Sequence, residues 1–182
     1  MKRLELFCEE LHNVLTRSDD QLNRARDCLK AWIEEGVEVP RAVGDAKPDT
    51  MVQYLLRTDI DNLFTVVSMV MAPHYATPIH NHGTWGLVGI VDGEEREERF
   101  DVSLDSAGIA HVHLRGEQIN RASAVTVLAS PHDEIHRITN LGDTPSRSIH
   151  VYGGNLDGLP RLAYQDGLAP ITFVTRLERL SS

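Results

Sequence analysis

Eight short runs rich in β-branched residues follow one another along most of the chain, and turn-forming residues separate them. They span residues 52–58, 63–72, 85–93, 94–104, 111–117, 123–130, 135–141 and 147–154. Short strands that recur every ~8 to 12 residues are typical of an all-β sandwich or barrel. The pattern therefore predicts an all-β fold, and a jelly-roll barrel is its simplest architecture.

The N-terminal part of the chain has a different periodicity. Apolar residues recur at helical spacing over residues 3–16, and residues 18–35 form a second candidate helix with Ser18 or Asp19 as its cap. Gly36 then ends the pattern. We expect two α-helices that pack on the outside of the barrel.

These patterns fit one domain in a chain of 182 residues. We predict that residues 1–182 form this domain, with the helices in residues 1–36 and the barrel in residues 51–175. The C-terminal residues 174–182 are expected to be peripheral.

Charge, hydropathy and cysteine content exclude several classes of protein. The formal net charge is -9, and Lys and Arg form no basic stripe, which argues against nucleic acid as a partner. No run of about 18 apolar residues is present, so we predict no membrane span. Cys8 and Cys28 are the only cysteines, and they form no disulfide framework. We therefore expect a soluble, cytoplasmic protein; its oligomeric state stays open.

His80 and His82 lie one residue apart in an apolar stretch beside a proline and two glycines. Side chains at positions i and i+2 of a strand point to the same face, so both imidazoles can reach one point inside a barrel. Neutral imidazole is a good ligand for iron, zinc, copper or nickel. A second pair, His111 and His113, lacks this glycine and proline setting, and we expect it on a solvent-facing strand.

The surroundings of His80 and His82 resemble the first of the two cupin motifs, with Gly93 at the matching distance. Pro131, His136 and Asn140 match the second motif, although Asp133 stands where that motif has glycine. The resemblance implies a double-stranded β-helix with metal ligands His80, His82 and His136. Gly86 occupies the slot of the usual carboxylate ligand, which leaves three neutral histidines and favours an anionic co-substrate on the metal.

Three stretches resemble the thiol dioxygenase branch of the cupins, which includes cysteine dioxygenase and 3-mercaptopropionate dioxygenase. They are "TPIHNHGTWGLVGIVDGEE", "DEIHRITN" and "SIHVYGGN". The last stretch matches the Ser-His-Tyr relay of that family. Ser148, His150 and Tyr152 alternate along one strand, so their polar groups can hydrogen-bond in series. The resemblance implies an Fe(II) cofactor, with Tyr152 beside bound oxygen or substrate.

Two further features favour the 3-mercaptopropionate type over the cysteine type. Gly86 stands where cysteine-specific members carry a crosslinked cysteine, so Tyr152 is expected to be unmodified. Gln53 and Arg161 occupy the slots of that subgroup's glutamine and arginine, and a guanidinium suits a carboxylate. Arg57 is the competing anchor for the carboxylate.

We therefore predict a mononuclear non-haem Fe(II) dioxygenase that converts a small mercapto-carboxylic acid to its sulfinic acid. A cysteine dioxygenase is the nearest alternative. Three histidines suit zinc or nickel equally well, so a cupin hydrolase or isomerase is a second class. A cupin that binds a small ligand without chemistry is a third. The sequence does not choose among 3-mercaptopropionate, mercaptosuccinate, cysteine and cysteamine.

Overall fold

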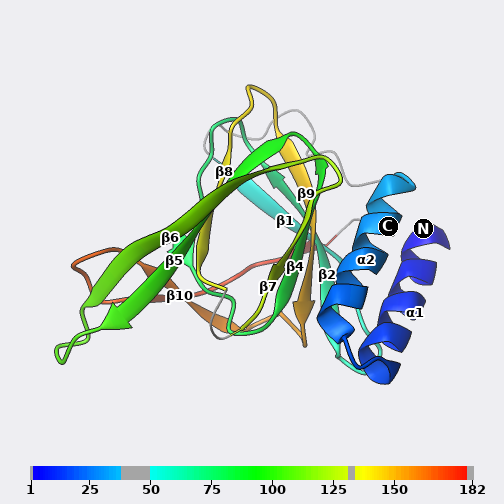
Figure 1. Cartoon of the computed structure of the whole chain (residues 1–182), viewed down its shortest axis with the longest axis horizontal. Coiled ribbons are helices and arrows are strands. Elements are labelled where there is room, and N and C mark those ends of the chain that lie inside the picture. The colour runs from blue at the N-terminus through cyan, green and yellow to red at the C-terminus, as the bar shows by residue number, and fades with distance from the viewer. Residues whose placement is uncertain (1, 38–49, 131–133, 180–182) are drawn as a thin grey trace.

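The computed structural model describes residues 2–37, 50–130 and 134–179, and it consists of two six-stranded β-sheets with two helices on one side (Figure 1). The first sheet has the strand order β12-β1-β2-β9-β4-β7. Its strands are β1 (Met51–Thr58), β2 (Phe64–Met71), β4 (Gly86–Asp92), β7 (Val125–Leu128), β9 (Ser146–Gly153) and β12 (Glu178–Arg179).

The second sheet has the order β11-β10-β3-β8-β5-β6. Its strands are β3 (Ile79–His80), β5 (Glu94–Leu104), β6 (Ala110–Arg121), β8 (His136–Asn140), β10 (Pro160–Tyr164) and β11 (Ile171–Val174). Successive strands of the chain alternate between the two sheets over much of the barrel, which is the connectivity of a jelly roll. The predicted all-β barrel is therefore confirmed.

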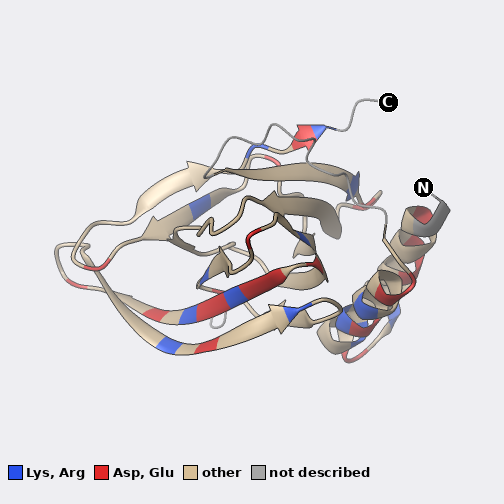
Figure 2. Ribbon diagram, turned by 90° about the horizontal axis from the view of Figure 1, so that it is seen from above, with Lys and Arg blue, Asp and Glu red and all other residues tan. Residues whose placement is uncertain are grey.

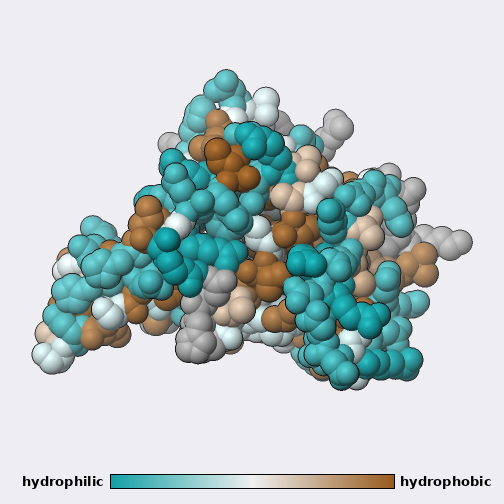
Figure 3. Space-filling model, in the orientation of Figure 1, coloured by the Kyte–Doolittle hydropathy of each residue, from teal (hydrophilic) through white to brown (hydrophobic). Residues whose placement is uncertain are grey.

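Helices α1 (Lys2–Arg17) and α2 (Gln21–Glu34) pack against the outer face of the first sheet (Figure 1). Their apolar stripes, with Leu11 and Leu29 fully buried, meet the outward side chains of β2, β4 and β9. The solvent face of the pair is largely hydrophilic (Figure 3). The expected position of the helices is confirmed.

The cap of α2 differs from the prediction. Asp20, rather than Ser18 or Asp19, occupies the N-cap position, and its side chain makes no capping hydrogen bond to the backbone. Its carboxylate instead accepts hydrogen bonds from the Asn23 amide. Gly36 does end this helix, because its φ of +90° is a conformation that glycine adopts without strain.

Strand β2 is buried along its whole length because both of its faces are covered. Phe64 and Val66 face the helices, whereas Val67, Met69 and Met71 belong to apolar clusters on the opposite face, inside the barrel. This explains why its sequence is continuously apolar instead of alternating.

Strand β3 ends at His80, so His82 lies beyond it rather than on the same strand as expected. Three further strands were not predicted from the sequence, namely β10, β11 and β12. The last of these corrects the expectation of a peripheral C-terminal tail, because β12 pairs in parallel with β1. The segment between β11 and β12 therefore crosses from the second sheet to the first.

Strands β5 and β6 form a long hairpin that extends away from the helix-covered side of the molecule (Figure 1). Acidic and basic residues mark this hairpin (Figure 2). Near the barrel, Glu95 and Glu97 are nevertheless buried, whereas Glu117 on β6 is exposed. Among the described residues, neither helix has the length and apolar character needed to span a bilayer.

Candidate metal centre

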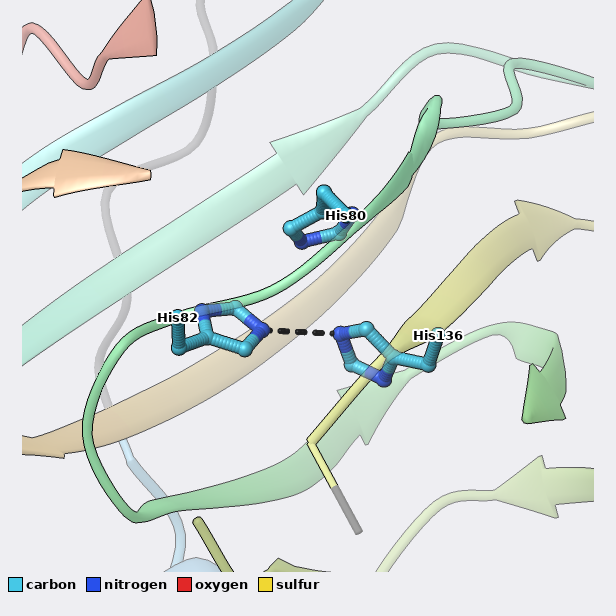
Figure 4. Close-up of side chains that lie close together, drawn as sticks. All are labelled: His80, His82 and His136. Atoms are coloured by element: carbon cyan, nitrogen blue, oxygen red, sulfur yellow. Dashed lines mark hydrogen bonds between the residues drawn. The ribbon is translucent and has the colours of Figure 1, made fainter. Parts of the chain in front are cut away.

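Three histidines from two neighbouring strands converge inside the barrel (Figure 4). His80 on β3 is paired in register with His136 on β8, and His82 follows β3 by two residues. One ring nitrogen of each lies within 4.8 Å of the others, and all three residues are buried. The Nε2 atoms of His82 and His136 are 2.9 Å apart. The structure thus brings together the three predicted ligands.

Two of these rings are oriented by an acceptor on the side away from the shared centre. His80 donates its Nδ1 proton to the carbonyl oxygen of Pro78 at 2.9 Å. His136 Nδ1 lies 3.2 Å from Oε1 of Glu97. Each contact fixes the tautomer in which Nδ1 carries the proton, so that the lone pair of Nε2 is available to a metal. Metal-binding histidines usually make such a hydrogen bond with their second ring nitrogen.

The electrostatics of the site favour a neutral His80, a neutral His82 and an ionised Glu97. Burial, followed by the mutual repulsion of the cations, lowers the pKa of His80 and His82 well below the ordinary value. Burial alone would raise the pKa of Glu97. The hydrogen bond from His136 and nearby positive charge outweigh burial and hold that pKa at about 2.

His82 has a different partner. Its Nδ1 lies 3.0 Å from Nη1 of Arg161, and a guanidinium can only donate, so Nδ1 accepts this hydrogen bond. The neutral ring then carries its proton on Nε2. Ligation of a metal through that Nε2 requires the proton to be on Nδ1, so this contact with Arg161 and ligation by His82 exclude one another.

The donor set otherwise fits a divalent transition metal. Three imidazoles converge, and the described residues that line the adjoining cavity include no Asp or Glu. The 2.9 Å between two Nε2 atoms is close to the ~3.0 Å expected for neighbouring ligands of a six-coordinate ion with metal–nitrogen bonds near 2.1 Å. A buried His80, His82 and His136 group can therefore bind a metal, whose identity these ligands do not fix.

The predicted relay is a continuous chain of hydrogen bonds on β9. Ser148 Oγ lies 2.9 Å from His150 Nε2, and His150 Nδ1 lies 2.8 Å from the Tyr152 hydroxyl. The ring of Tyr152 stacks on His82 with centroids 4.9 Å apart, and the nearby Arg161 favours the deprotonated form of its phenol. The relay therefore ends beside a candidate metal ligand.

Burial sets the charge states of this chain. It lowers the pKa of His150 to about 3, and electrostatic interactions with His136 and Arg161 act in the same direction. It raises the pKa of Tyr152 to about 12, which Arg161 opposes without cancelling. At neutral pH the relay therefore consists of a neutral imidazole and a protonated phenol.

A cavity of about 190 Å³ adjoins the three histidines. Tyr152, Arg161 and Gln53 line it, together with Met69 and Phe173. The predicted relay and both predicted anchors thus reach the same space. The alternative anchor, Arg57, does not line it and lies instead in a separate crevice against α1.

Other residues named from the sequence have structural or surface positions. His111 and His113 are exposed on β6, as expected. Asn140 has a structural role, since its amide donates to the carbonyls of Met71 and Ala72 at the end of β2 and to that of Thr144 in the turn after β8. Pro131 and Asp133 lie outside the described residues. Gly86 faces Tyr152 across β4 and β9, and an added Cβ would contact the phenol ring at 3.2 Å.

Some residues of the site were not found from the sequence. Glu97 lies in a strongly charged run whose alternation could have indicated that acids at 95 and 97 share a face. Glu134 is buried and accepts a hydrogen bond from the His82 backbone N–H at 3.2 Å. Phe173 and Arg176 carry no signal of their own in the sequence, because only the fold brings the C-terminal segment to the cavity.

A comparison with solved structures finds matches at low sequence identity. A protein with a double-stranded β-helix domain from Klebsiella pneumoniae is 12% identical, with a TM-score of 0.49 over 74% of this chain and 95% of that one. A cupin domain of a transcriptional regulator from Enterobacter cloacae is 18% identical, with a TM-score of 0.40 over 58% and 97%. An oxalate oxidase in complex with glycolate is 18% identical, with a TM-score of 0.48 over 67% of this chain.

The chain spans 60% of the oxalate oxidase chain it matches. No protein-family model matches the sequence. The two facing sheets and the order of their strands define the fold as a double-stranded β-helix. Within that class, the chain has a buried centre of three histidines that can hold a metal.

Proposed function

We propose that this protein is a mononuclear Fe(II) thiol dioxygenase that converts a small mercapto-carboxylic acid to its sulfinic acid. The observation that carries the proposal is that three buried histidines able to hold a metal, the hydrogen-bonded pair His150 and Tyr152, and a buried arginine without an ion pair all line one small cavity. In the balanced reaction, both atoms of O2 are added to the thiol sulfur. The O–O bond breaks, two S–O bonds form, and the sulfur supplies four electrons.

Arg161 supports an anionic substrate. Its side chain is buried, its Nε has no hydrogen-bond partner, and no described residue forms an ion pair with it. It instead contacts His82, Tyr152 and the ring of Phe173, whose centroid is 5.1 Å away. A buried cation without an anion is costly, and a substrate carboxylate in the cavity would supply the missing partner.

Gln53 supports the same conclusion from the other sheet. Its buried Oε1 has no partner, and its Nε2 contacts only the sulfur atoms of Met51 and Met69, at 4.0 and 3.7 Å. Thioether sulfur is a weak acceptor. A carboxylate oxygen would satisfy this amide far better, so Gln53 and Arg161 would hold the acid end of the substrate together.

Fe(II) held by His80, His82 and His136 would offer coordination positions for both a thiolate and O2, and it would supply electrons for the reaction. The chain itself would control the protons. With a pKa near 12, the Tyr152 hydroxyl is a proton donor at neutral pH, and its chain through His150 to Ser148 keeps it oriented. The apolar side chains of Met69 and Phe173 would limit the water in the cavity.

The test is oxygen consumption by protein loaded anaerobically with Fe(II), with the product identified by mass spectrometry. The substrates are 3-mercaptopropionate, mercaptosuccinate, cysteine and cysteamine, and Zn(II)-loaded protein is the control. We expect one O2 consumed per sulfinate formed, with little activity on cysteamine, which has no carboxylate for Arg161. Strongest activity on cysteine would make the protein a cysteine dioxygenase.

The absence of oxygen uptake with any thiol, from protein shown to hold one iron per chain, would overturn the proposal. Activity of the zinc or nickel form without O2 would instead support a cupin hydrolase or isomerase. Ligand binding without turnover in any metal form would leave a binding protein.

A further inference from the structure

A second arginine lines the cavity beside the one assigned to the substrate carboxylate. Arg161 is buried, with 3% of its surface exposed, whereas Arg176 is exposed to solvent. Since both line the same cavity, Arg161 lies at its inner part and Arg176 at its opening.

The position of Arg176 follows from the crossing of the chain between the two sheets. Strand β11 ends at Val174, where it pairs with β10, and β12 begins at Glu178, where it pairs with β1. Residues 175–177 therefore connect β11, which pairs with the strand of Arg161, to β12, which pairs with the strand of Gln53. Arg176 lies in the middle of this connection.

Charge sets this cavity apart from the rest of the protein. The chain has a formal net charge of -9, yet the described residues that line the cavity include two arginines and no acid. Neither Arg161 nor Arg176 forms an ion pair with any described residue. By contrast, Arg179 lies outside the cavity and 4.0 Å from a carboxylate oxygen of Asp157. Two unpaired cations at different depths favour a ligand with two negative groups.

The size of the cavity restricts the ligand to a small molecule. Its volume of about 190 Å³ is below the roughly 300–1,000 Å³ of typical small-molecule pockets. A four-carbon dicarboxylic acid is a ligand of the corresponding small size.

We propose that Arg176 is a specificity-determining residue that recognises a second carboxylate, so that the preferred substrate class is a small thiol-bearing dicarboxylic acid. This inference rests on the proposed function for the role of the thiol, but not for the two anionic groups. One carboxylate pairs with Arg161 and Gln53 inside the cavity, and the other pairs with Arg176 at its opening.

The test measures ligand binding rather than turnover. Zn(II)-loaded protein is titrated anaerobically in a calorimeter with mercaptosuccinate, 3-mercaptopropionate, succinate and propionate. The variants are Arg176→Gln and, as a matched control, Arg179→Gln, an exposed arginine three positions along the same segment. Circular dichroism checks that both variants are folded.

We expect the wild-type protein and Arg179→Gln to bind mercaptosuccinate about fivefold or more tightly than 3-mercaptopropionate, as an added charge-assisted contact allows. Arg176→Gln should remove this preference by weakening mercaptosuccinate alone, and added salt should reduce it in the wild type. Equal affinities in the wild type, or a preference that survives in Arg176→Gln, would overturn the inference.

The two proposals fail in distinguishable ways. If both thiols bind tightly and only in the metal-loaded protein but without preference, the inference fails and the thiol dioxygenase proposal survives. If the thiols bind no more tightly than succinate and propionate, the thiol proposal fails. An Arg176-dependent preference for succinate over propionate would then still support a dianion site.

Discussion

His136 and Glu97 form a buried charge-assisted hydrogen bond, in which the imidazole Nδ1 donates to a carboxylate oxygen 3.2 Å away. Glu97 is itself fixed by Gln118 and Asn120, whose amides donate to its other oxygen at 2.9 and 3.2 Å. Residues on three strands thus determine the direction in which one candidate metal ligand points.

We expect Glu97→Gln to weaken metal binding by about tenfold, as is typical when a carboxylate behind a histidine ligand is removed. The neutral amide accepts the Nδ1 proton less strongly, and its own N–H group conflicts with Gln118 and Asn120. Competition of a chelator for Zn(II) or Co(II) measures the effect. Glu117→Gln, on the exposed surface of β6, is the control, and equal affinities in the two variants would contradict the prediction.

Tyr152→Phe should lower the turnover of the preferred thiol by about a hundredfold, the lower end of what a positioned proton donor contributes. Substrate affinity should stay within about threefold, because Arg161 and Gln53 remain in place. Stopped-flow oxygen consumption and calorimetric binding separate the two effects. Tyr75 does not line the cavity, so the control variant Tyr75→Phe should leave both turnover and affinity unchanged.

The buried carboxyl of Glu95 should make the free energy of unfolding depend on pH. Burial raises the pKa of this carboxyl from 4.5 to about 7, although a hydrogen bond from Ser146 opposes the shift. Between these pH values the unfolded chain releases a proton that the folded protein retains. The free energy of unfolding therefore falls as the pH rises through this window, by about 3 kcal/mol for this group.

Urea denaturation at pH 5 and pH 8 tests this sign. Glu95→Gln should lose most of the decrease between the two pH values, whereas Glu94→Gln, a partly exposed neighbour, should retain it. An undiminished pH dependence in Glu95→Gln would show that other groups cause it.

Gly89 on β4 lies directly beneath α2. A Cβ added there would collide with Ile33 and press on Leu29, so Gly89→Ala should destabilise the protein by about 1–3 kcal/mol through overpacking. Gly116 on β6 has nothing within 4 Å of its added Cβ, and Gly116→Ala should change stability by less than about 0.5 kcal/mol. The urea midpoints of the two variants measure their stabilities. Equal destabilisation would mean that α2 does not limit the space above Gly89.

The parts of the fold that could be predicted from the sequence have strong local periodicity. The helices and the longer barrel strands carry apolar patterns with a period of 3.6 or 2, and the motif spacing around His80 and His136 identified the residues that meet in the barrel. Ser148, His150 and Tyr152 alternate on one strand, so their hydrogen-bonded chain needed no knowledge of the fold beyond that strand.

The remaining parts depend on tertiary contacts that leave little local pattern. Strands β3 and β12 have two residues each, and β11 is mostly exposed, so none shows a clear alternation. Asp20 became the helix cap although two neighbouring residues have equal propensity. Arg176 reaches the cavity only because β12 pairs with a strand more than 100 positions earlier, and no window of the sequence contains that information.

The cavity takes its lining from positions between Met51 and Arg176, which has a consequence for when it can form during synthesis. A nascent chain that ends soon after His136 already contains all three candidate ligands but lacks β10, which flanks β3 through the pairing of Ala163 with His80. The metal centre would then be open on that side, and the cavity would lack Arg161 and Arg176. We therefore infer that stable metal uptake follows release of the barrel from the ribosome, when its last strands have paired.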